Sequence, residues 1–345
     1  MKYTTLPNTD IKVSKICLGT MTYGEQNTEA EGHEQIDFAL DKGVNFLDTA
    51  EMYSIPGKAE TQGSTEEIIG SWFKRSGKRE EVVLASKVVG PGNAMDHIRD
   101  NLGFSKEAVT DALHKSLKRL QTDYIDLYQL HWPERNTNFF GKLGYEHDEN
   151  EAWEENFQEV LETLSDFVKE GKIRQVGLSN ETPYGVMRFL EESRKHDLPK
   201  MITVQNPYNL LNRKDEVGLT EVLHRENVGL FPYSPLGMGT LSGKHLDGIE
   251  PNSRLGLFSQ YKRYSGDVAV KATRAYSEIA KKHNLNFAQM SLAFVNTRPF
   301  VTSNIIGATS IKQLEENIGS IEVKLSEEVL EEINKVHEAY PNPAP

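Results

Sequence analysis

Short, nearly continuous apolar runs recur along the chain and are separated by longer amphipathic segments. Such runs are typical of parallel β-strands that are buried on both faces. The pattern predicts eight strands, which are ICLGTM (16–21), NFLDTA (45–50), VVLASK (82–87), DLYQLH (126–131), RQVGLSN (174–180), ITVQNP (202–207), GLFPYS (229–234) and NIIGAT (304–309).

The amphipathic segments between these runs predict helices. Residues 105–120 carry apolar side chains at spacings of three and four, and Ser105 is a suitable N-cap. Residues 64–73 begin with Ser64 and have Glu67 three positions later, which is the pattern of a capping box. The segment 155–171 ends in Gly171, which favours the end of a helix there.

Eight strands that alternate with helices fit a closed (β/α)8 barrel or an open, doubly wound sheet. The number of strands favours the barrel. The first strand is also not followed by GxGxxG, the phosphate loop of an open dinucleotide-binding sheet. The sequence therefore predicts an α/β fold in which residues 1–345 form a single (β/α)8 TIM barrel domain.

Three connections add to this barrel. The turn sequence PNTD (7–10) lies between two short alternating runs and predicts an N-terminal β-hairpin at the bottom of the barrel. Long loops are expected at 132–154, after the fourth strand, and at 235–267, after the seventh. Both follow the carboxyl ends of strands, so they are expected to lie over the face where barrel enzymes build their active sites.

The charge balance restricts the classes of partner. Lys plus Arg number 39 and Asp plus Glu number 51, a formal net charge of −12, which argues against nucleic acids and anionic membranes. The single cysteine, Cys17, excludes a disulfide within the chain. The N-terminus has no signal-peptide pattern, and no apolar run reaches about 18 residues. We therefore expect a soluble, cytoplasmic protein.

Four polar side chains follow successive predicted strands: Asp48 and Tyr53 after the second, Lys87 at the end of the third and His131 at the end of the fourth. The carboxyl ends of barrel strands meet on one face. A carboxylate, a phenol, an amine and an imidazole gathered there can protonate a carbonyl oxygen while hydride arrives from another molecule.

Other interpretations of these four residues stay open. Each residue alone could instead serve packing, capping or the surface. A metal site is disfavoured because the apolar strands offer no second histidine at a ligating position. A barrel hydrolase that uses Asp48 and a glutamate as acid and base is a weaker alternative, and it gives the glycine-rich segment 234–244 no role.

Ordered blocks over essentially the whole chain resemble the aldo-keto reductase family. They are LGTMTYG (18–24), LDTAEMYS (47–54), LASK (84–87), YQLHWP (128–133), VGLSN (176–180), VQNPYN (204–209), YSPLGMGTLSGK (233–244) and GATSIKQLEEN (307–317). The loop contents and the closing HEAYPNPAP further resemble the bacterial Tas subgroup, which is related to the β-subunits of potassium channels. The resemblance implies a (β/α)8 barrel that binds NADPH in an extended form.

The resemblance also assigns catalytic roles to the four strand-end residues. It implies that Tyr53 is the general acid and that Lys87 lowers the pKa of its phenol. Asp48 would hold Lys87 through a charged hydrogen bond, and His131 would orient the substrate carbonyl by donating a hydrogen bond. The expected reaction is the NADPH-dependent reduction of an aldehyde or ketone to an alcohol, with hydride from the nicotinamide and a proton from Tyr53.

A cofactor site for NADPH/NADP+ is implied in the same way. The nicotinamide carboxamide would bind to the ends of strands five and six, and Tyr233 would stack on the ring. Glycines after strand seven would let the backbone approach the pyrophosphate. The expected cofactor-binding residues are Thr20, Met21, Ser179, Asn180, Gln205, Tyr233, Ser234, Pro235, Leu236, Gly237, Met238, Gly239, Thr240, Leu241, Ser242, Gly243, Lys244, Arg254, Gly307, Thr309, Gln313, Glu316 and Asn317.

The choice of NADPH over NADH depends on cations near the 2′-phosphate. Gln313 stands where many family members carry an arginine. Lys244 and Arg254, however, match cations that the channel-subunit branch uses for this phosphate. The sequence therefore predicts NADPH.

Aromatic and apolar side chains are candidates for the substrate pocket, and they suit an apolar aldehyde or ketone. They are Tyr23, Met52, Trp132 and the loop aromatics Phe139, Phe140 and Tyr145. The resemblance to channel subunits also suggests an alternative function, a redox-sensing or regulatory subunit that binds NADPH and turns over slowly.

Overall fold

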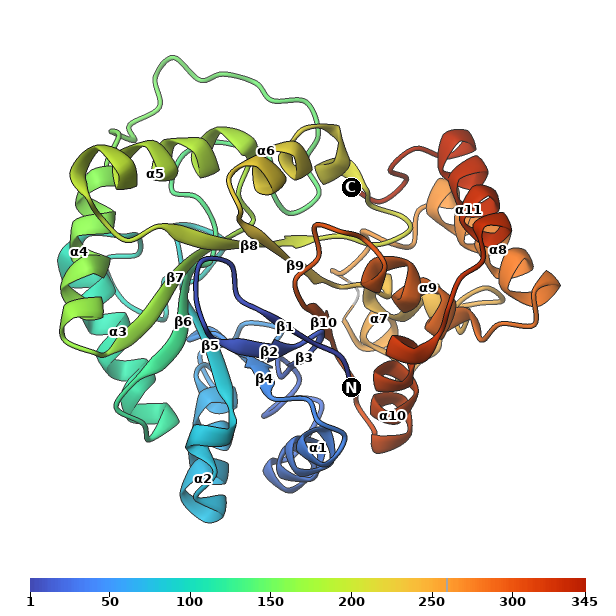
Figure 1. Ribbon diagram of the computed structural model, residues 1–345, viewed down its shortest axis with the longest axis horizontal. Helices are drawn as coiled ribbons and strands as arrows, with labels where there is room; N and C mark the ends of the chain where they lie inside the picture. Colours follow the sequence, from blue (N-terminus) through green and yellow to red (C-terminus); the bar gives the residue numbers. More distant parts are fainter. Residues whose placement is uncertain (259) are drawn as a thin grey trace.

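Eight parallel strands form a barrel that is surrounded by helices in the computed structural model, which describes residues 1–258 and 260–345 (Figure 1). The strands are β3 (Ile16–Gly19), β4 (Phe46–Asp48), β5 (Val83–Val88), β6 (Ile125–Leu130), β7 (Ile173–Ser179), β8 (Met201–Pro207), β9 (Gly229–Tyr233) and β10 (Asn304–Ile306). Each strand overlaps one of the predicted apolar runs. The predicted α/β barrel is therefore confirmed.

The strands follow one another around the barrel in the order β10, β3, β4, β5, β6, β7, β8 and β9, and every adjacent pair in this order is parallel. Figure 1 shows the last strand, β10, beside the first, β3. Between β9 and β10 the ladder is reduced to one isolated bridge that pairs Leu230 with Val301. This bridge nearly closes the barrel.

The N-terminal hairpin covers one end of the barrel, as predicted. Its strands β1 (Tyr3–Thr5) and β2 (Lys12–Ser14) pair antiparallel. Leu6, Ile11 and Val13 of the hairpin are buried in one cluster with side chains from the strands, among them Phe46 and Phe231. These two rings meet edge to face with centroids 5.2 Å apart. The hairpin thus completes the apolar filling of the barrel.

The outer layer consists of helices whose apolar faces pack on the strands in the main hydrophobic core. The α-helices are α1 (Glu29–Asp41), α2 (Ser64–Ser76), α3 (Lys106–Leu120), α4 (Phe157–Lys169), α5 (Pro183–His196), α6 (Leu219–Arg225), α7 (Arg254–Leu257), α8 (Asp267–Lys282), α9 (Phe287–Asn296), α10 (Ile311–Gly319) and α11 (Glu327–Ala339). Short 3-10 helices occur at η1 (Arg79–Glu81), η2 (Lys214–Val217), η3 (Gly237–Ser242) and η4 (Ser320–Glu322).

Two of the three predicted helix ends agree with the structure. The Ser105 side chain caps α3 by accepting a hydrogen bond from the Ala108 amide, and Gly171 follows α4 with a φ of +73°. The capping box at Ser64 was wrong. Ser64 is the first residue inside α2, and Gly63 occupies the N-cap in a left-handed conformation that offers no side chain.

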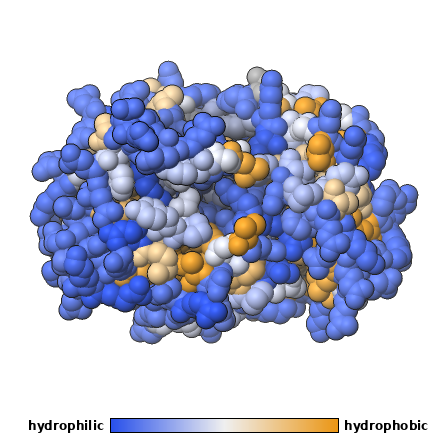
Figure 2. Space-filling model, turned by 90° about the horizontal axis from the view of Figure 1, so that it is seen from above, coloured by the Kyte–Doolittle hydropathy of each residue, from blue (hydrophilic) through white to orange (hydrophobic). Residues whose placement is uncertain are grey.

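The two long loops follow β6 and β9, as expected. Residues 131–156 contain no helix or strand, whereas the loop after β9 contains η3 and α7. Figure 2 shows a face of the molecule that is predominantly hydrophilic, with hydrophobic side chains in scattered patches. Among the described residues, no helix has the length and apolar composition needed to span a membrane.

Candidate active site

The carboxyl ends of the barrel strands open into a cavity of about 1210 Å³. Its walls come from the ends of β3, β4 and β6 to β10, from both long loops and from the start of α10. Most of the predicted catalytic and cofactor-binding residues line this one cavity. Volumes of this order accommodate an extended ligand as well as a small substrate.

A buried ion pair lies at the base of the cavity, between neighbouring strands. The Lys87 Nζ atom donates hydrogen bonds of 2.7 Å to Asp48 Oδ2 and 2.7 Å to the Thr49 carbonyl oxygen. The Lys87 side chain is inaccessible to solvent. Burial therefore lowers the pKa of Lys87, and the Asp48 charge opposes this effect. Asp48 thus holds Lys87, as the sequence predicts.

Tyr53 follows β4 and faces the cavity, where its ring meets the His131 ring edge to face with centroids 5.8 Å apart. The pKa of Tyr53 differs from expectation. Burial raises it well above the usual value, the Asp48 carboxylate raises it further, and Arg254 opposes them. The Lys87 ammonium is already paired with Asp48, so it does not dominate as expected. Tyr53 therefore stays protonated, which is the form a proton donor needs.

His131 follows β6 and is neutral in this environment. Burial, together with the Lys87 charge, lowers its pKa well below the usual value. The Nδ1 atom is enclosed and has no hydrogen-bond partner among the described residues, which leaves Nε2 as the nitrogen open to the cavity. A neutral imidazole with its Nε2 proton in the cavity can donate a hydrogen bond to a carbonyl oxygen.

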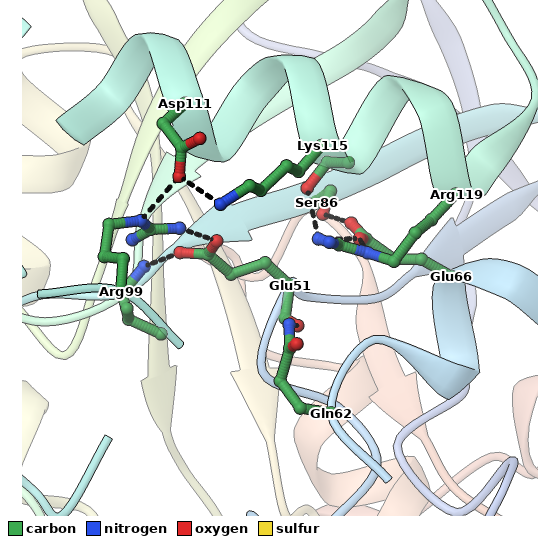
Figure 3. Close-up of polar contacts among 10 residues, drawn as sticks. Glu51, Gln62, Glu66, Ser86, Arg99, Asp111, Lys115 and Arg119 are labelled. Carbon is green, nitrogen blue, oxygen red and sulfur yellow. Dashed lines mark hydrogen bonds and ion pairs between the residues drawn. The ribbon is translucent and has the colours of Figure 1, made fainter. Parts of the chain in front are cut away.

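The buried contacts of Glu51 fix the segment that carries Tyr53. Glu51 was not identified from the sequence as a structural residue of the site. The Glu51 side chain accepts a hydrogen bond of 2.8 Å from the Val89 amide and pairs with Arg99 (Figure 3). Arg99 also contacts Asp111 of α3. Glu51 is 1% exposed, so it has exchanged water for these partners. The detectable signal was a second acidic residue, after Asp48, within LDTAEMY.

A second buried carboxylate continues this polar layer between α2 and α3. Glu66 accepts hydrogen bonds from Ser86 of β5 and from Arg119 of α3, at 2.6 and 2.8 Å (Figure 3). Both carboxylates belong to segments flanking the strand that carries Lys87. The network therefore fixes the outer side of the same strand whose end carries the catalytic candidate.

The predicted carboxamide residues form one hydrogen-bonded group at the ends of β7, β8 and β9. Ser179 Oγ donates to the Gln205 carbonyl oxygen at 2.8 Å, and Asn180 Nδ2 donates to the His131 carbonyl oxygen at 2.9 Å. The Tyr233 hydroxyl donates to Asn180 Oδ1 at 2.6 Å. Gln205 Nε2 donates to Asp48 Oδ1 at 2.8 Å. The Gln205 amide oxygen thus remains available for a ligand donor.

The loop after β9 lies along the cavity, but only some of its residues line it. Gly239 has a φ of +91°, and a Cβ there would lie 2.6 Å from Cε of Lys244, so glycine allows the lysine to fold over the loop. Within the glycine-rich segment 234–244, the lining residues are Ser234, Pro235, Leu236, Met238, Gly239, Ser242 and Lys244. Four predicted residues are absent from the wall: Gly237, Thr240, Leu241 and Gly243. Leu241 instead belongs to the main core.

Two cations in this loop lack a carboxylate partner. Neither Lys244 nor Arg254 forms an ion pair with any residue that the structure describes. Burial lowers the pKa of both groups, and the Arg254 charge lowers that of Lys244 further. Among the described residues, the hydrogen-bond acceptors near Arg254 are Gln26 Oε1 at 3.4 Å and the Met21 sulfur at 3.7 Å. Two such cations in one cavity favour an anionic ligand.

The start of α10 completes this end of the cavity, and Thr20 and Met21 after β3 also line it. Ser310 caps the helix by accepting a hydrogen bond from the Gln313 amide. Gln313 accepts hydrogen bonds from the Thr309 amide and hydroxyl, and Asn317 donates to the Gly307 carbonyl oxygen. These residues and Glu316 line the cavity, as predicted.

The candidates for the substrate pocket divide into two groups. Met52, Trp132 and Phe140 line the cavity, and the rings of Trp132 and Phe140 meet with centroids 5.7 Å apart. Tyr23 does not line it, because its ring is fully buried in the main core, with the hydroxyl directed at Gln35. Tyr145 also lies apart, 55% exposed.

Phe139 packs behind the wall, against Phe140. The cavity also has wall residues that the sequence did not indicate, including Asn93, Arg263 and Pro345. Arg263 lies within the predicted long loop, but nothing in its local sequence distinguishes it from a solvated charge. Pro345 reaches the cavity because the tail packs back on the barrel, where the Ala344 amide donates to the Leu211 carbonyl oxygen.

A possible metal-ligand group lies away from this cavity. Ligand atoms of His283, Glu328 and Glu332 lie within 4.8 Å of one another, between α8 and α11. Lys282 already pairs with both glutamates. The group is therefore explained by ion pairing at the surface.

The barrel and the side chains at its mouth agree with the comparisons to known proteins. The Aldo/keto reductase family model matches residues 15–338, and the chain belongs to this family of oxidoreductases, whose general chemistry is carbonyl reduction. The chain is 51% identical over 347 residues to Protein tas of Escherichia coli (strain K12), with 100% of both chains covered. The expected likeness to the Tas subgroup is thereby confirmed.

More distant relatives carry names of the same general class. The chain is 33% identical to Uncharacterized oxidoreductase YrpG of Bacillus subtilis (strain 168), covering 99% of this chain and 97% of the relative. It is 26% identical to Norsolorinic acid reductase B of Dothistroma septosporum, covering 97% and 80%. These names support an oxidoreductase.

Proposed function

We propose that this protein reduces aldehydes or ketones to alcohols with NADPH and that Tyr53 is the general acid. The observation that carries the proposal is the joint placement of a protonated phenol and a neutral imidazole in the wall of one cavity, which also contains cations with no carboxylate partner among the described residues. The phenol and imidazole suit a carbonyl oxygen, and the cations suit a phosphorylated cofactor.

The residues present fit NADPH. The cations Lys244 and Arg254 have no carboxylate among the described residues, so phosphate groups would supply their missing partners. The Gln205 amide oxygen is available for the carboxamide NH2, since its NH2 is engaged by Asp48. Tyr233 would contact the nicotinamide face. When bound, NADPH supplies the hydride.

The chain's own residues then control the proton and the position of the carbonyl. His131 Nε2 would donate a hydrogen bond to the carbonyl oxygen and orient it. As negative charge develops on that oxygen, the Tyr53 hydroxyl would donate its proton, and the Lys87 ammonium 5.0 Å from the ring centroid would stabilise the phenolate that remains. Asp48 keeps Lys87 in position throughout.

The direct test compares wild type with Tyr53→Phe. NADPH consumption with 4-nitrobenzaldehyde should fall by about a hundredfold or more, because the variant lacks the transferable proton. A fluorescence titration with NADPH serves as the control, and it should give similar affinities for both proteins. Equal turnover in the two proteins would refute Tyr53 as the acid. Tight NADPH binding with negligible turnover in wild type would favour the redox-sensing alternative.

A further inference from the structure

Arg263 is a third cation of the cavity wall, besides Lys244 and Arg254. It lies between α7 and α8, in the loop after β9, and it is half-buried. Its Nε atom lies 3.1 Å from the position that a Cβ on Gly141 would occupy. Gly141 follows Phe140, an aromatic residue of the substrate wall. The guanidinium is thus where the two long loops meet.

The surroundings of Arg263 connect it to the reacting end of the cavity. Although burial opposes the effect, the side chains of Tyr264 and Tyr233 are near enough to its guanidinium to raise its pKa. The Tyr233 hydroxyl donates to Asn180, whose amide donates to the His131 carbonyl oxygen. Arg263 therefore lies near the end of the cavity where the carbonyl would bind.

No carboxylate of the described residues pairs with Arg263. Three other arginines each bind one: Arg99 pairs with Glu51, Arg135 with Glu181 and Arg213 with Glu216. Arg254 of the same cavity, like Arg263, forms no ion pair with the described residues and is assigned above to the cofactor phosphate. Withdrawing a guanidinium from water is unfavourable unless a charged partner compensates. Two tyrosine side chains do not supply a charge. The position favours an anion. Its neighbours are Gly141 beside the substrate wall, Tyr233, and an oxygen of Pro345, which lies 3.2 Å from the same Cβ position on Gly141 but forms no ion pair with Arg263.

We propose that Arg263 binds a carboxylate of the substrate, so that the preferred substrates are oxo acids and aldehyde acids. The proposal rests on the function proposed above, because it assigns a substrate class to the same site. A guanidinium and a carboxylate can form two parallel hydrogen bonds, which would fix the substrate at a second point. The aromatic wall would contact the part of the substrate between the carbonyl and the acid.

The test uses matched pairs of acid and neutral substrates. The rigid pair is 4-carboxybenzaldehyde and methyl 4-formylbenzoate, and the flexible pair is 4-oxobutanoate and its methyl ester. For each pair the readout is the ratio of kcat/KM for the acid to that for the ester, measured with NADPH at low ionic strength. The ester corrects for any general loss of activity in a variant.

In Arg263→Met, the acid-to-ester ratio should fall about tenfold or more in at least one pair, mainly through KM for the acid. Lys262→Met is the matched control, because Lys262 is the adjacent, exposed cation of the same wall. Its ratio should stay within about threefold of wild type, since an exposed charge is screened.

Three results would overturn the proposal. The ratio could be unchanged in Arg263→Met for both pairs. The ratio could fall equally in Lys262→Met, which would indicate that the positive electrostatic potential of the whole cavity, and not Arg263 in particular, attracts the acid. Arg263→Met could weaken NADPH binding about tenfold, which would assign Arg263 to the cofactor.

Failure of the proposed function is distinguishable from these results. It would appear as no turnover of any of the four substrates in wild type. Calorimetric titration with terephthalate would then still test the carboxylate site without catalysis. Binding that is lost in Arg263→Met supports the proposal, and binding that is absent from wild type or unchanged in the variant overturns it.

Discussion

The Lys87 ammonium lies 5.0 Å from the centroid of the Tyr53 ring, while its hydrogen bonds go to Asp48 and Thr49. The lysine thus contributes its charge at a distance, and its orientation is determined by a carboxylate. With the phenol pKa raised by burial, the proton stays on Tyr53 until a stronger base develops beside it.

Asp48→Asn should be strongly destabilising and nearly inactive. The substitution leaves the buried Lys87 charge without its partner, which costs about 3–5 kcal/mol. Urea unfolding measures this loss. In the double variant Asp48→Asn/Lys87→Met, both charges are gone, so stability should largely recover while activity stays lost. A double variant as unstable as the single one would contradict this account.

Glu51→Gln should lower both stability and kcat, although Glu51 does not touch the cavity. The variant leaves the buried Arg99 without its closest carboxylate and loosens the segment that carries Tyr53. We expect a loss of about 3 kcal/mol in urea unfolding. Asp111→Asn is the control, because Asp111 contacts the same arginine but is 41% exposed, and its loss should stay within about 1 kcal/mol. Equal effects would show that burial of Glu51 is unimportant.

Lys244→Ala/Arg254→Ala should weaken NADPH binding far more than NADH binding. Charge-assisted contacts to phosphate contribute about 1.5–3 kcal/mol each, so the NADPH Kd should rise about a hundredfold or more. Fluorescence titration of both cofactors gives the comparison. An unchanged NADPH Kd would remove these cations from the cofactor site, and equal losses for both cofactors would assign them to the pyrophosphate.

His131 should make the wild-type protein less stable as the pH falls below 6.5. In this pH range His131 binds a proton in the unfolded state but stays neutral in the folded state, because its pKa is lowered on folding. The contribution to stability therefore falls with pH by up to about 1.4 kcal/mol per pH unit. His131→Asn lacks this contribution. Urea unfolding at pH 6.5 and pH 5 should show a smaller loss in the variant, and equal losses would contradict a neutral buried imidazole.

Asp215→Asn should stabilise the protein at neutral pH. Burial raises the pKa of Asp215 from 3.8 to about 6. Between these values only the folded state binds the proton, so wild-type stability falls as pH rises and the full cost, about 3 kcal/mol, is present above pH 6. The gain should be larger at pH 7.5 than at pH 4.5. The exposed Asp10→Asn should change stability by less than about 0.5 kcal/mol, and an equal gain there would refute the explanation.

The sequence predicted the barrel well because doubly buried strands leave near-continuous apolar runs, and each run in the chain became a strand. The strand-end residues Asp48, Tyr53, Lys87 and His131 were predictable because parallel strands deliver their ends to one face. For the residues of η3, the sequence did not show which of them would line the cavity. Thr240 and Leu241 lie within the same glycine-rich block as the cavity residues, but the tight turns at Met238 and Gly239 direct them elsewhere.

Side-chain partners at long range could not be inferred. Tyr23 follows a barrel strand, yet its ring packs against α1 and α2, where Gly32 and Ile68 surround it. Glu51 and Arg99 are separated by 48 residues and no local pattern connects them. The pKa of Tyr53 also depends on how deeply the side chain is buried, which the sequence does not specify. The pKa is therefore raised, whereas we expected from the sequence that it would be lowered.

The isolated bridge between Leu230 and Val301 is the sparsest junction between neighbouring barrel strands. The loop after β9 and the start of α10 follow the two strands that it joins, and both supply walls of the cavity. A molecule that spans these walls would couple its own binding free energy to closure of the barrel. Slower amide hydrogen exchange at the edges of β9 and β10 would then report occupancy directly, without any chemical turnover.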